Sequence, residues 1–417
     1  MQEFTEKILA NGIKLYHYAA NFPVSSFEIM LPIGSAHAGV KGGIIPGGAP
    51  HFLEHMQMLR SINYPEKGLL DKKIGLEGGY NNAYTMPFWT AYGMTAPSDS
   101  VEATLPGLVE RVFSPIFEKE DFENQRQIIT NEREHRRKFF PGNSQSSQYF
   151  GLQFMNDVSI ELDRVFGSPE ALATFDPELM YKVHHQAAAT EGVVAFSAGA
   201  HDPLLFEDVL TAIAPSRRVE APSQFDQTTW VHKEYHEKSF ENITQPSLTV
   251  AWIMPGLTYE EKTGLNFLLN YFCNSVHGPL YEILRHDKGW VYDLDWYHVN
   301  LPQQQMYGMN FPVMDTKVIQ EIRSSLFGWF REALHDQVRV EKEIHRRIRH
   351  QVTWYETAEG TVEDEADGYR THGRWIRHEE WERAIRHMAD PEHRRFIFES
   401  YLARQDWFGE MAFLPED

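Results

Sequence analysis

The chain of 417 residues contains a single cysteine, Cys273. One cysteine cannot form an intrachain disulfide, and it excludes a cysteine-based zinc site and a dithiol redox pair. Cys273 lies in the apolar stretch LLNYFCNSV, where free cysteine usually behaves as a small hydrophobic residue. We therefore expect it in the core and look elsewhere for chemistry.

Long apolar runs are also missing. No uninterrupted apolar stretch approaches the roughly 20 residues that span a bilayer. The first residues, MQEFTEKILANGIKLYHY, do not combine a basic segment with an apolar one, as a secretion signal does. The sequence thus predicts no membrane segment and a cytoplasmic location.

Positive charge is scarce. The chain has 39 lysines and arginines but 59 aspartates and glutamates, which gives a formal net charge of -20. This charge repels phosphate backbones and anionic lipid, so we expect neither nucleic acid nor membrane as a partner. Cationic or neutral partners are favoured.

The length predicts about two domains, each with its own core. Alternating strand and helix patterns occur twice in the same order, with a polar stretch, PSRRVEAPSQFDQTTW, between the two blocks. We predict domains at 1–214 and 231–417 joined by a linker at 215–230. The expected class is α+β: two related domains, each a mainly antiparallel sheet with helices packed on one face.

The stretch PGGAPHFLEHMQMLR is the main candidate for chemistry. On a helix, His51, Glu54 and His55 project from one face, because positions 0, 3 and 4 fall within a fan of about 100°. Two neutral imidazoles supply two ligands of a tetrahedral zinc ion, and a carboxylate beside them can take a proton from water. The five-residue pattern alone would occur by chance in roughly one such sequence in ten.

Catalytic zinc normally has a third protein ligand, and the helical segment DFENQRQIITNEREHRRKF offers one. Phe122, Ile128 and Ile129 mark its apolar face, and Glu132 follows on that face at helical spacing. Burying an unpaired carboxylate is costly, so zinc is a suitable partner for Glu132. A solvated ion pair with Arg136 is the alternative left open.

With both segments in view, the sequence resembles the inverzincin metallopeptidases, the family of pitrilysin, insulysin and the mitochondrial processing peptidase, whose signature is H-x-x-E-H. GAPHFLEHM resembles the family's zinc helix, and SPIFEKEDFENQRQIITNERE resembles the helix of the third ligand, which places Glu132 77 residues past His55. The resemblance implies that His51, His55 and Glu132 bind zinc and that Glu54 is the general base.

Two further segments carry the resemblance. GLEGGYNNAYTMPFWTAYGMTAP is similar to the family's G-G-x-x-N-A-x-T edge strand, which implies that Asn82 and Ala83 contact an extended peptide by strand addition. GPLYEILRHDKGWVYDL is similar to its substrate segment, which implies that Arg285 and Tyr292 bind substrate. The chain departs from the family at Gln125, seven residues before the third ligand, where many members carry an acid.

The resemblance also implies an assembly. Longer members enclose substrate between two halves, and this chain corresponds to one half, so we expect a homodimer, with a related second chain as the other option. The implied substrate is a peptide or an unfolded segment, and the implied activity is zinc-dependent endopeptidase. A non-catalytic peptide-binding or scaffold subunit remains an alternative, and the native metal, natural substrate and cleavage preference stay open.

Overall fold

The computed structural model describes residues 4–40, 43–139, 164–189, 191–216, 235–240, 243–273, 278–301 and 304–416. It divides into two compact units, which are composed of Met1–Arg133, Ser159–Asp226 and Val352–Trp375 in the first, and Glu134–Val158, Gln227–Gln351 and Ile376–Asp417 in the second. Val352–Trp375 thus clusters with the first unit, whereas the sequence-based boundaries put it in the second domain. Most of the predicted linker, from residue 217 onward, lies outside the described residues.

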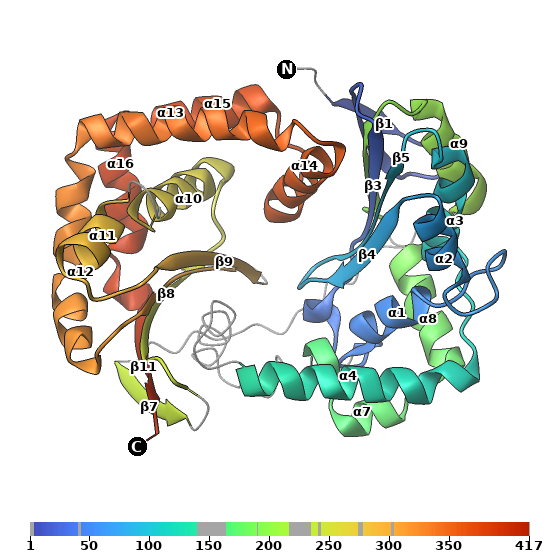
Figure 1. Ribbon diagram of the computed structural model, residues 1–417, viewed down its shortest axis with the longest axis horizontal. Helices are drawn as coiled ribbons and strands as arrows, with labels where there is room; N and C mark the ends of the chain where they lie inside the picture. Colours follow the sequence, from blue (N-terminus) through green and yellow to red (C-terminus); the bar gives the residue numbers. More distant parts are fainter. Residues whose placement is uncertain are drawn as a thin grey trace. The chain divides into compact units, whose positions relative to one another are not determined.

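The first unit is built on a six-stranded sheet in the order β1-β2-β6-β3-β5-β4. Figure 1 labels β1, β3, β5 and β4 of this sheet. The strands are β1 (Thr5–Ile8), β2 (Lys14–Ala19), β3 (Val24–Leu31), β4 (Tyr80–Thr85), β5 (Thr90–Pro97) and β6 (Val194–Gly199). Among the described strand pairs of this sheet, β2–β6 is parallel and the others are antiparallel. β4 is the terminal strand of the sheet, and it pairs with β5 alone.

Helices cover both faces of this sheet. The helices of the unit are α1 (Ala49–Gln57), α2 (Leu69–Leu76), α3 (Val101–Phe113), α4 (Lys119–Phe139), α7 (Pro169–Ala173), α8 (Pro177–Ala188), α9 (Pro203–Ile213) and α14 (Ala358–His372), with a short 3-10 turn at Ser35–His37. On one face, Phe27 of β3 packs against Phe206 of α9. On the other, Met30 of β3 joins Val362 and Tyr369 of α14 in a buried cluster. The predicted single helical layer is therefore supplemented by α14, a helix from late in the sequence.

The second unit has a five-stranded sheet in the order β7-β11-β8-β10-β9. Its strands are β7 (His236–Phe240), β8 (Ser247–Pro255), β9 (Asp295–Leu301), β10 (Gln304–Pro312) and β11 (Phe408–Pro415). Its helical segments are α10 (Tyr259–Cys273), α11 (Pro279–Tyr281), η2 (Glu282–Asp287), η3 (Thr316–Val318), α12 (Ile319–Leu334), α13 (Gln337–Trp354, which runs into the first unit), α15 (His378–His387), α16 (Pro391–Ile397), η4 (Phe398–Leu402) and η5 (Gln405–Trp407). Cys273 is buried in this unit's core cluster, as predicted.

The two sheets share one topology. Leaving β1 aside, each has its strands in the spatial order first, fifth, second, fourth, third along the chain, and the first and fifth strands are parallel in both. The prediction of two related, mainly antiparallel α+β units is confirmed.

A buried ion pair holds α14 on the first sheet, and a second buried carboxylate of α14 bonds to residues that flank the helix in sequence. Arg370 of α14 pairs with Glu28 of β3 at 2.6 Å, and these side chains are only 7% and 8% exposed. Glu365 accepts hydrogen bonds from the Tyr355 hydroxyl and from Trp375 Nε1, and burial raises its pKa to about 7. Both carboxylates satisfy their acceptor capacity within the unit, as buried polar groups must.

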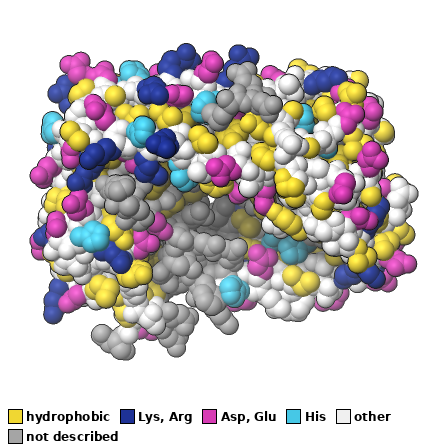
Figure 2. Space-filling view, turned by 45° about the horizontal axis from the view of Figure 1, so that its top comes forward, with side chains coloured by type: hydrophobic (Ala, Val, Ile, Leu, Met, Phe, Trp, Pro, Cys, Tyr) yellow, Lys and Arg dark blue, Asp and Glu magenta, His cyan; other side chains and the backbone are white. Residues whose placement is uncertain are grey.

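No helix within the described ranges is both long and apolar enough to cross a membrane. On the face shown in Figure 2, acidic and basic side chains are interspersed. The single-sign basic stripe that backbone binding to nucleic acid requires is not seen on this face.

Candidate metal centre

Helix α1 begins at a glycine whose geometry no other residue tolerates well. Gly48, at the N-cap, has φ of 80°, and a Cβ there would lie 2.4 Å from the backbone nitrogen of Gly167. Pro50 occupies the first turn, where its missing N–H costs nothing. The glycine and proline residues before the histidines therefore form a tight turn and begin the helix that carries His51 and His55.

Helix α4 contributes the third candidate ligand. Phe122 and Ile129 are buried, whereas Ile128 is 41% exposed, so the expectation that Ile128 marks the apolar face is wrong. The buried stripe instead runs through Phe122, Gln125 and Ile129 at spacings of three and four, and Glu132 continues it. Phe122 packs on Phe52 of α1 with ring centroids 5.5 Å apart, which fixes α4 beside the histidines.

His51, His55 and Glu132 come together as predicted. Oε2 of Glu132 lies 3.6 Å from Nε2 of His51 and 3.8 Å from Nε2 of His55. One ligand atom from each side chain can be chosen so that all lie within 4.8 Å of one another, and no other group of this kind occurs in the described part of the chain. The side chain of Arg136, the alternative partner of Glu132, lies outside the described residues.

The spacing fits a tetrahedral metal ion. Zinc with bonds of about 2.0–2.2 Å holds its ligand atoms about 3.4 Å apart, close to the separations from Glu132 to the two histidines. Two nitrogens and one carboxylate oxygen leave one position open, which is the donor set of catalytic rather than structural zinc. The cluster is thus a suitable site for zinc.

Glu54 lies beside the cluster without belonging to it. Its side chain is buried, and Oε2 accepts a hydrogen bond of 2.6 Å from the Thr85 hydroxyl of β4. Burial raises its pKa to about 7, and the nearby charge of Glu132 adds to the shift. A carboxyl that titrates near neutral pH can both accept and return a proton. Thr85 was not singled out from the sequence, although it is the threonine of the strand segment that carries the family resemblance.

Gln125, which stands where many family members carry an acid, bonds to one of the candidate ligands. Nδ1 of His55 donates to the Gln125 amide oxygen at 3.1 Å, and Gln125 is only 4% exposed. A donor at Nδ1 leaves Nε2 as the lone-pair nitrogen, which faces Glu132. An amide oxygen therefore orients the ring here, where many family members have a carboxylate.

Arg285 and Tyr292 lie in the second unit and contact each other. The guanidinium carbon of Arg285 lies 4.2 Å from the centroid of the Tyr292 ring, a cation–π contact, and Tyr292 is 69% exposed. Their substrate role stays a prediction.

Asn82 and Ala83 lie on β4, opposite Gly93 and Tyr92 of β5. Side chains alternate along this strand: Asn81 bonds Arg111 of α3 on the helical face that holds α1, while Tyr84 bonds Glu28 on the α14 face. No described strand pairs with the outer edge of β4, so its main chain is available there for an added strand.

A sheet flanked by a His-His-Glu cluster on helices α1 and α4 is typical of metal-dependent hydrolases. Comparison with known proteins narrows this class. The family model described as Insulinase (Peptidase family M16) matches residues 16–140, and the model described as Peptidase M16 inactive domain matches residues 194–352. The chain belongs to peptidase family M16. The recognition of the family from its motifs is confirmed.

Individual proteins and structures that are similar to this chain are also peptidases by their names. Protease 3 of Escherichia coli K12 is 29% identical over 85 residues, which cover 20% of this chain and 9% of that protein. The structure of a putative M16-like peptidase from Alicyclobacillus acidocaldarius superposes with a TM-score of 0.81 at 17% identity, covering 99% of this chain and 98% of that one. The periplasmic protease PqqL of Escherichia coli gives a TM-score of 0.75 at 14% identity, with all of this chain on 48% of that one. The two structures share the fold, and the match to Protease 3 spans a small part of its length.

Proposed function

We propose that the chain is a zinc-dependent metalloendopeptidase that cleaves peptides or unstructured polypeptide segments. The observation that carries the proposal is the cluster of His51, His55 and Glu132 with the buried carboxylate of Glu54 next to it. Family membership supports peptidase chemistry at the level of class.

The two histidines and Glu132 would hold the metal through Nε2 atoms and a carboxylate oxygen. Bound zinc supplies Lewis acidity, which polarises a peptide carbonyl and makes water a stronger acid. Glu54 removes a proton from the attacking water and later gives it to the leaving amine. Thr85 fixes one oxygen of Glu54, so the other is left to face the water. The hydrogen bond from His55 to Gln125 keeps that ring in the ligating tautomer.

Substrate would bind as an extended strand along the outer edge of β4. Main-chain pairing fixes the position of a peptide while tolerating many side chains. Because Thr85 at the end of β4 contacts Glu54, a peptide on this edge passes the proton-transferring group. Asn82 and Ala83 lie on the pairing segment.

We further infer a chamber formed by two copies of the chain. All of this chain aligns with 48% of the length of PqqL, which supports the view that it corresponds to one half of such a protein. In our proposal a second copy of the chain supplies the other half. In a homodimer, Arg285 and Tyr292 of one protomer would stabilise developing negative charge at the zinc of its partner, as a guanidinium and a phenol can. A related second chain would serve the same purpose.

The peptidase is tested by incubating a large mixture of unstructured peptides with wild type and with Glu54→Gln, each assayed for bound zinc. Fragments from wild type and none from the zinc-loaded variant support both the activity and the base. Equal fragmentation by both refutes the role of Glu54. Zinc-loaded wild type that cleaves nothing, alone or at high concentration, favours the scaffold subunit instead.

The dimer is tested by complementation. Glu54→Gln and Arg285→Ala chains are each inactive by this mechanism, but a mixture recovers activity if Arg285 acts across the interface. Random pairing leaves about one quarter of all sites with both groups intact. Recovery near zero in a mixture shown to exchange subunits would place both groups within one protomer.

A further inference from the structure

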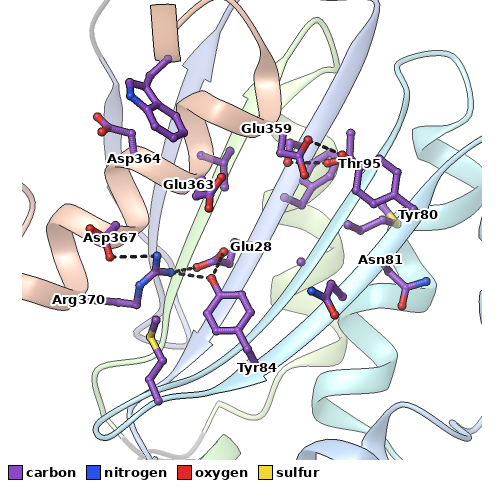
Figure 3. Close-up of a pocket in the computed structure, with 18 residues that line it drawn as sticks. Glu28, Tyr80, Asn81, Tyr84, Thr95, Glu359, Glu363, Asp364, Asp367 and Arg370 are labelled. Carbon is purple, nitrogen blue, oxygen red and sulfur yellow. Dashed lines mark hydrogen bonds and ion pairs between the residues drawn. The ribbon is translucent and has the colours of Figure 1, made fainter. Parts of the chain in front are cut away.

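A cavity of about 520 Å³ lies beside β4 within the first unit (Figure 3). One wall is α14, and the others are β4 and the neighbouring strands β3 and β5. It opens on the α14 face of the sheet, since Tyr84 from β4 bonds Glu28 there. The zinc cluster is on the other face, so the cavity is a separate feature.

Carboxylates line its helical wall. Glu359, Glu363 and Asp367 repeat every fourth residue of α14, all are exposed, and all line the cavity. Like charges at this spacing destabilise a helix. Arg370 is the only cation among the lining residues, and it is already paired with Glu28.

The three exposed carboxylates differ in their hydrogen-bond and ion-pair partners. Glu359 accepts a hydrogen bond from the Tyr80 hydroxyl, and Asp367 lies 3.5 Å from Arg370. Glu363 has no hydrogen-bond or ion-pair partner among the described residues. Its charge is therefore uncompensated within the described wall of the cavity.

Other lining groups favour an organic occupant over a lone metal ion. Tyr80 is 52% exposed, and Tyr84 and Trp354 add aromatic surface, which suits the methylene stem of a long side chain and attracts cations.

The cavity is lined by β4, whose outer edge no described strand covers. In a strand added to this edge, alternate side chains point to opposite faces of the sheet. One set faces α1 and the zinc cluster, and the other set faces the cavity, at intervals of about 7 Å. A peptide presented to Glu54 thus places every second side chain along the carboxylate wall.

We propose that this cavity is a specificity subsite for a lysine or arginine side chain of the peptide that pairs with β4. Glu363 receives the cationic group, the aromatic side chains contact its stem, and the preference for basic residues is confined to alternate peptide positions. The proposal rests on the proposed peptidase function, because it assumes an extended peptide on β4.

The test uses a set of quenched fluorogenic peptides in which one position at a time is arginine or its uncharged counterpart glutamine. For wild type, kcat/KM should favour arginine about tenfold at positions two residues apart and not at those between them. Glu363→Gln should remove this preference by lowering kcat/KM for the arginine peptides about tenfold, to the level of the glutamine peptides. The preference should also weaken with added salt.

Glu102→Gln is the matched control, since Glu102 is an exposed carboxylate on α3, which packs on the opposite face of the sheet. It should leave the arginine preference unchanged. Glu363→Lys should reverse the preference toward a glutamate peptide. An arginine preference that survives Glu363→Gln, or that Glu102→Gln removes equally, overturns the proposal.

Binding separates this proposal from the peptidase function. The Glu54→Gln chain is titrated with labelled arginine and glutamine peptides and followed by fluorescence anisotropy. Tighter binding of the arginine peptide that is lost on adding Glu363→Gln supports the subsite even where wild type cleaves nothing. Equal binding of the arginine and glutamine peptides refutes the subsite. Tight binding of calcium that displaces neither peptide also refutes the subsite.

Discussion

The hydrogen bond from His55 to Gln125 leads to a measurable prediction about metal affinity. Gln125→Leu removes the acceptor while keeping a side chain of similar size at a position that is 4% exposed. Loss of such an outer-shell partner typically weakens metal binding by about 10–100-fold. The bond here is 3.1 Å long and neutral, and the His55 side chain is 20% exposed, so water can partly replace the amide. We therefore expect the low end, about tenfold, or about 1.4 kcal/mol.

The assay is competition for zinc with a chromophoric chelator, which requires no catalysis. Gln125→Glu should bind zinc more tightly than wild type, because a carboxylate is the stronger acceptor. Gln127→Leu is the control, since Gln127 lies on the same helix, is exposed, and bonds only Asn131. A zinc Kd for folded Gln125→Leu within twofold of wild type would refute the idea that Gln125 orients the ligand.

Three predictions concern the stability of the first unit. Arg370→Met leaves Glu28 buried without its cation and should lower the free energy of unfolding, measured by urea denaturation, by about 3–5 kcal/mol. Adding Glu28→Gln to this variant should restore much of the lost stability. If the stability losses of the two single variants simply add in the double variant, the two side chains do not form a buried pair. Burial holds the pKa of Glu365 at about 7 against an ordinary value of 4.5, so the folded state binds the proton more tightly. The stabilising contribution of this proton is complete below pH 4.5 and is lost as the pH rises through 7, which lowers the free energy of unfolding by about 3 kcal/mol. Glu365→Gln should remove this pH dependence. If the free energy of unfolding of the variant has the same slope against pH as that of wild type, Glu365 is not the group responsible. Gly48→Ala should lower the thermal midpoint, because φ of 80° and the close approach of Gly167 oppose a Cβ, and a midpoint equal to wild type would show that the α1 start can relax.

Much of the candidate metal centre could be predicted from the sequence, because its geometry is local. The spacing of His51, Glu54 and His55 fixes a common face once the segment is helical, and helical spacing placed Glu132 on an inward-facing stripe. The mistaken assignment of Ile128 shows the limit of this reasoning. Hydrophobic type marks a face only approximately, and packing of Phe122 against Phe52 decided which face of α4 turns inward.

The polar neighbours of the site were less accessible to sequence reasoning. Thr85 is 31 residues from Glu54, and Gln125 is 70 residues from His55, yet both form hydrogen bonds to them. Contacts of this kind depend on the register of β4 against β5 and on the placement of α4. Neither is determined by local propensity or by the spacing within one motif.

By itself, the sequence determined the fold class, the family and the candidate metal ligands. Two α+β units and the acidic balance follow from residue types and from periods of two and 3.6, which act over a few neighbouring residues. The resemblance of two segments to a known family singled out Glu132 beside the two histidines. The tertiary structure alone decided that α14 covers the second face of the first sheet, and with it the carboxylate wall along β4. That arrangement joins residues more than 250 positions apart, through buried contacts such as Arg370 with Glu28, and long-range packing of this kind leaves no local signal in the chain.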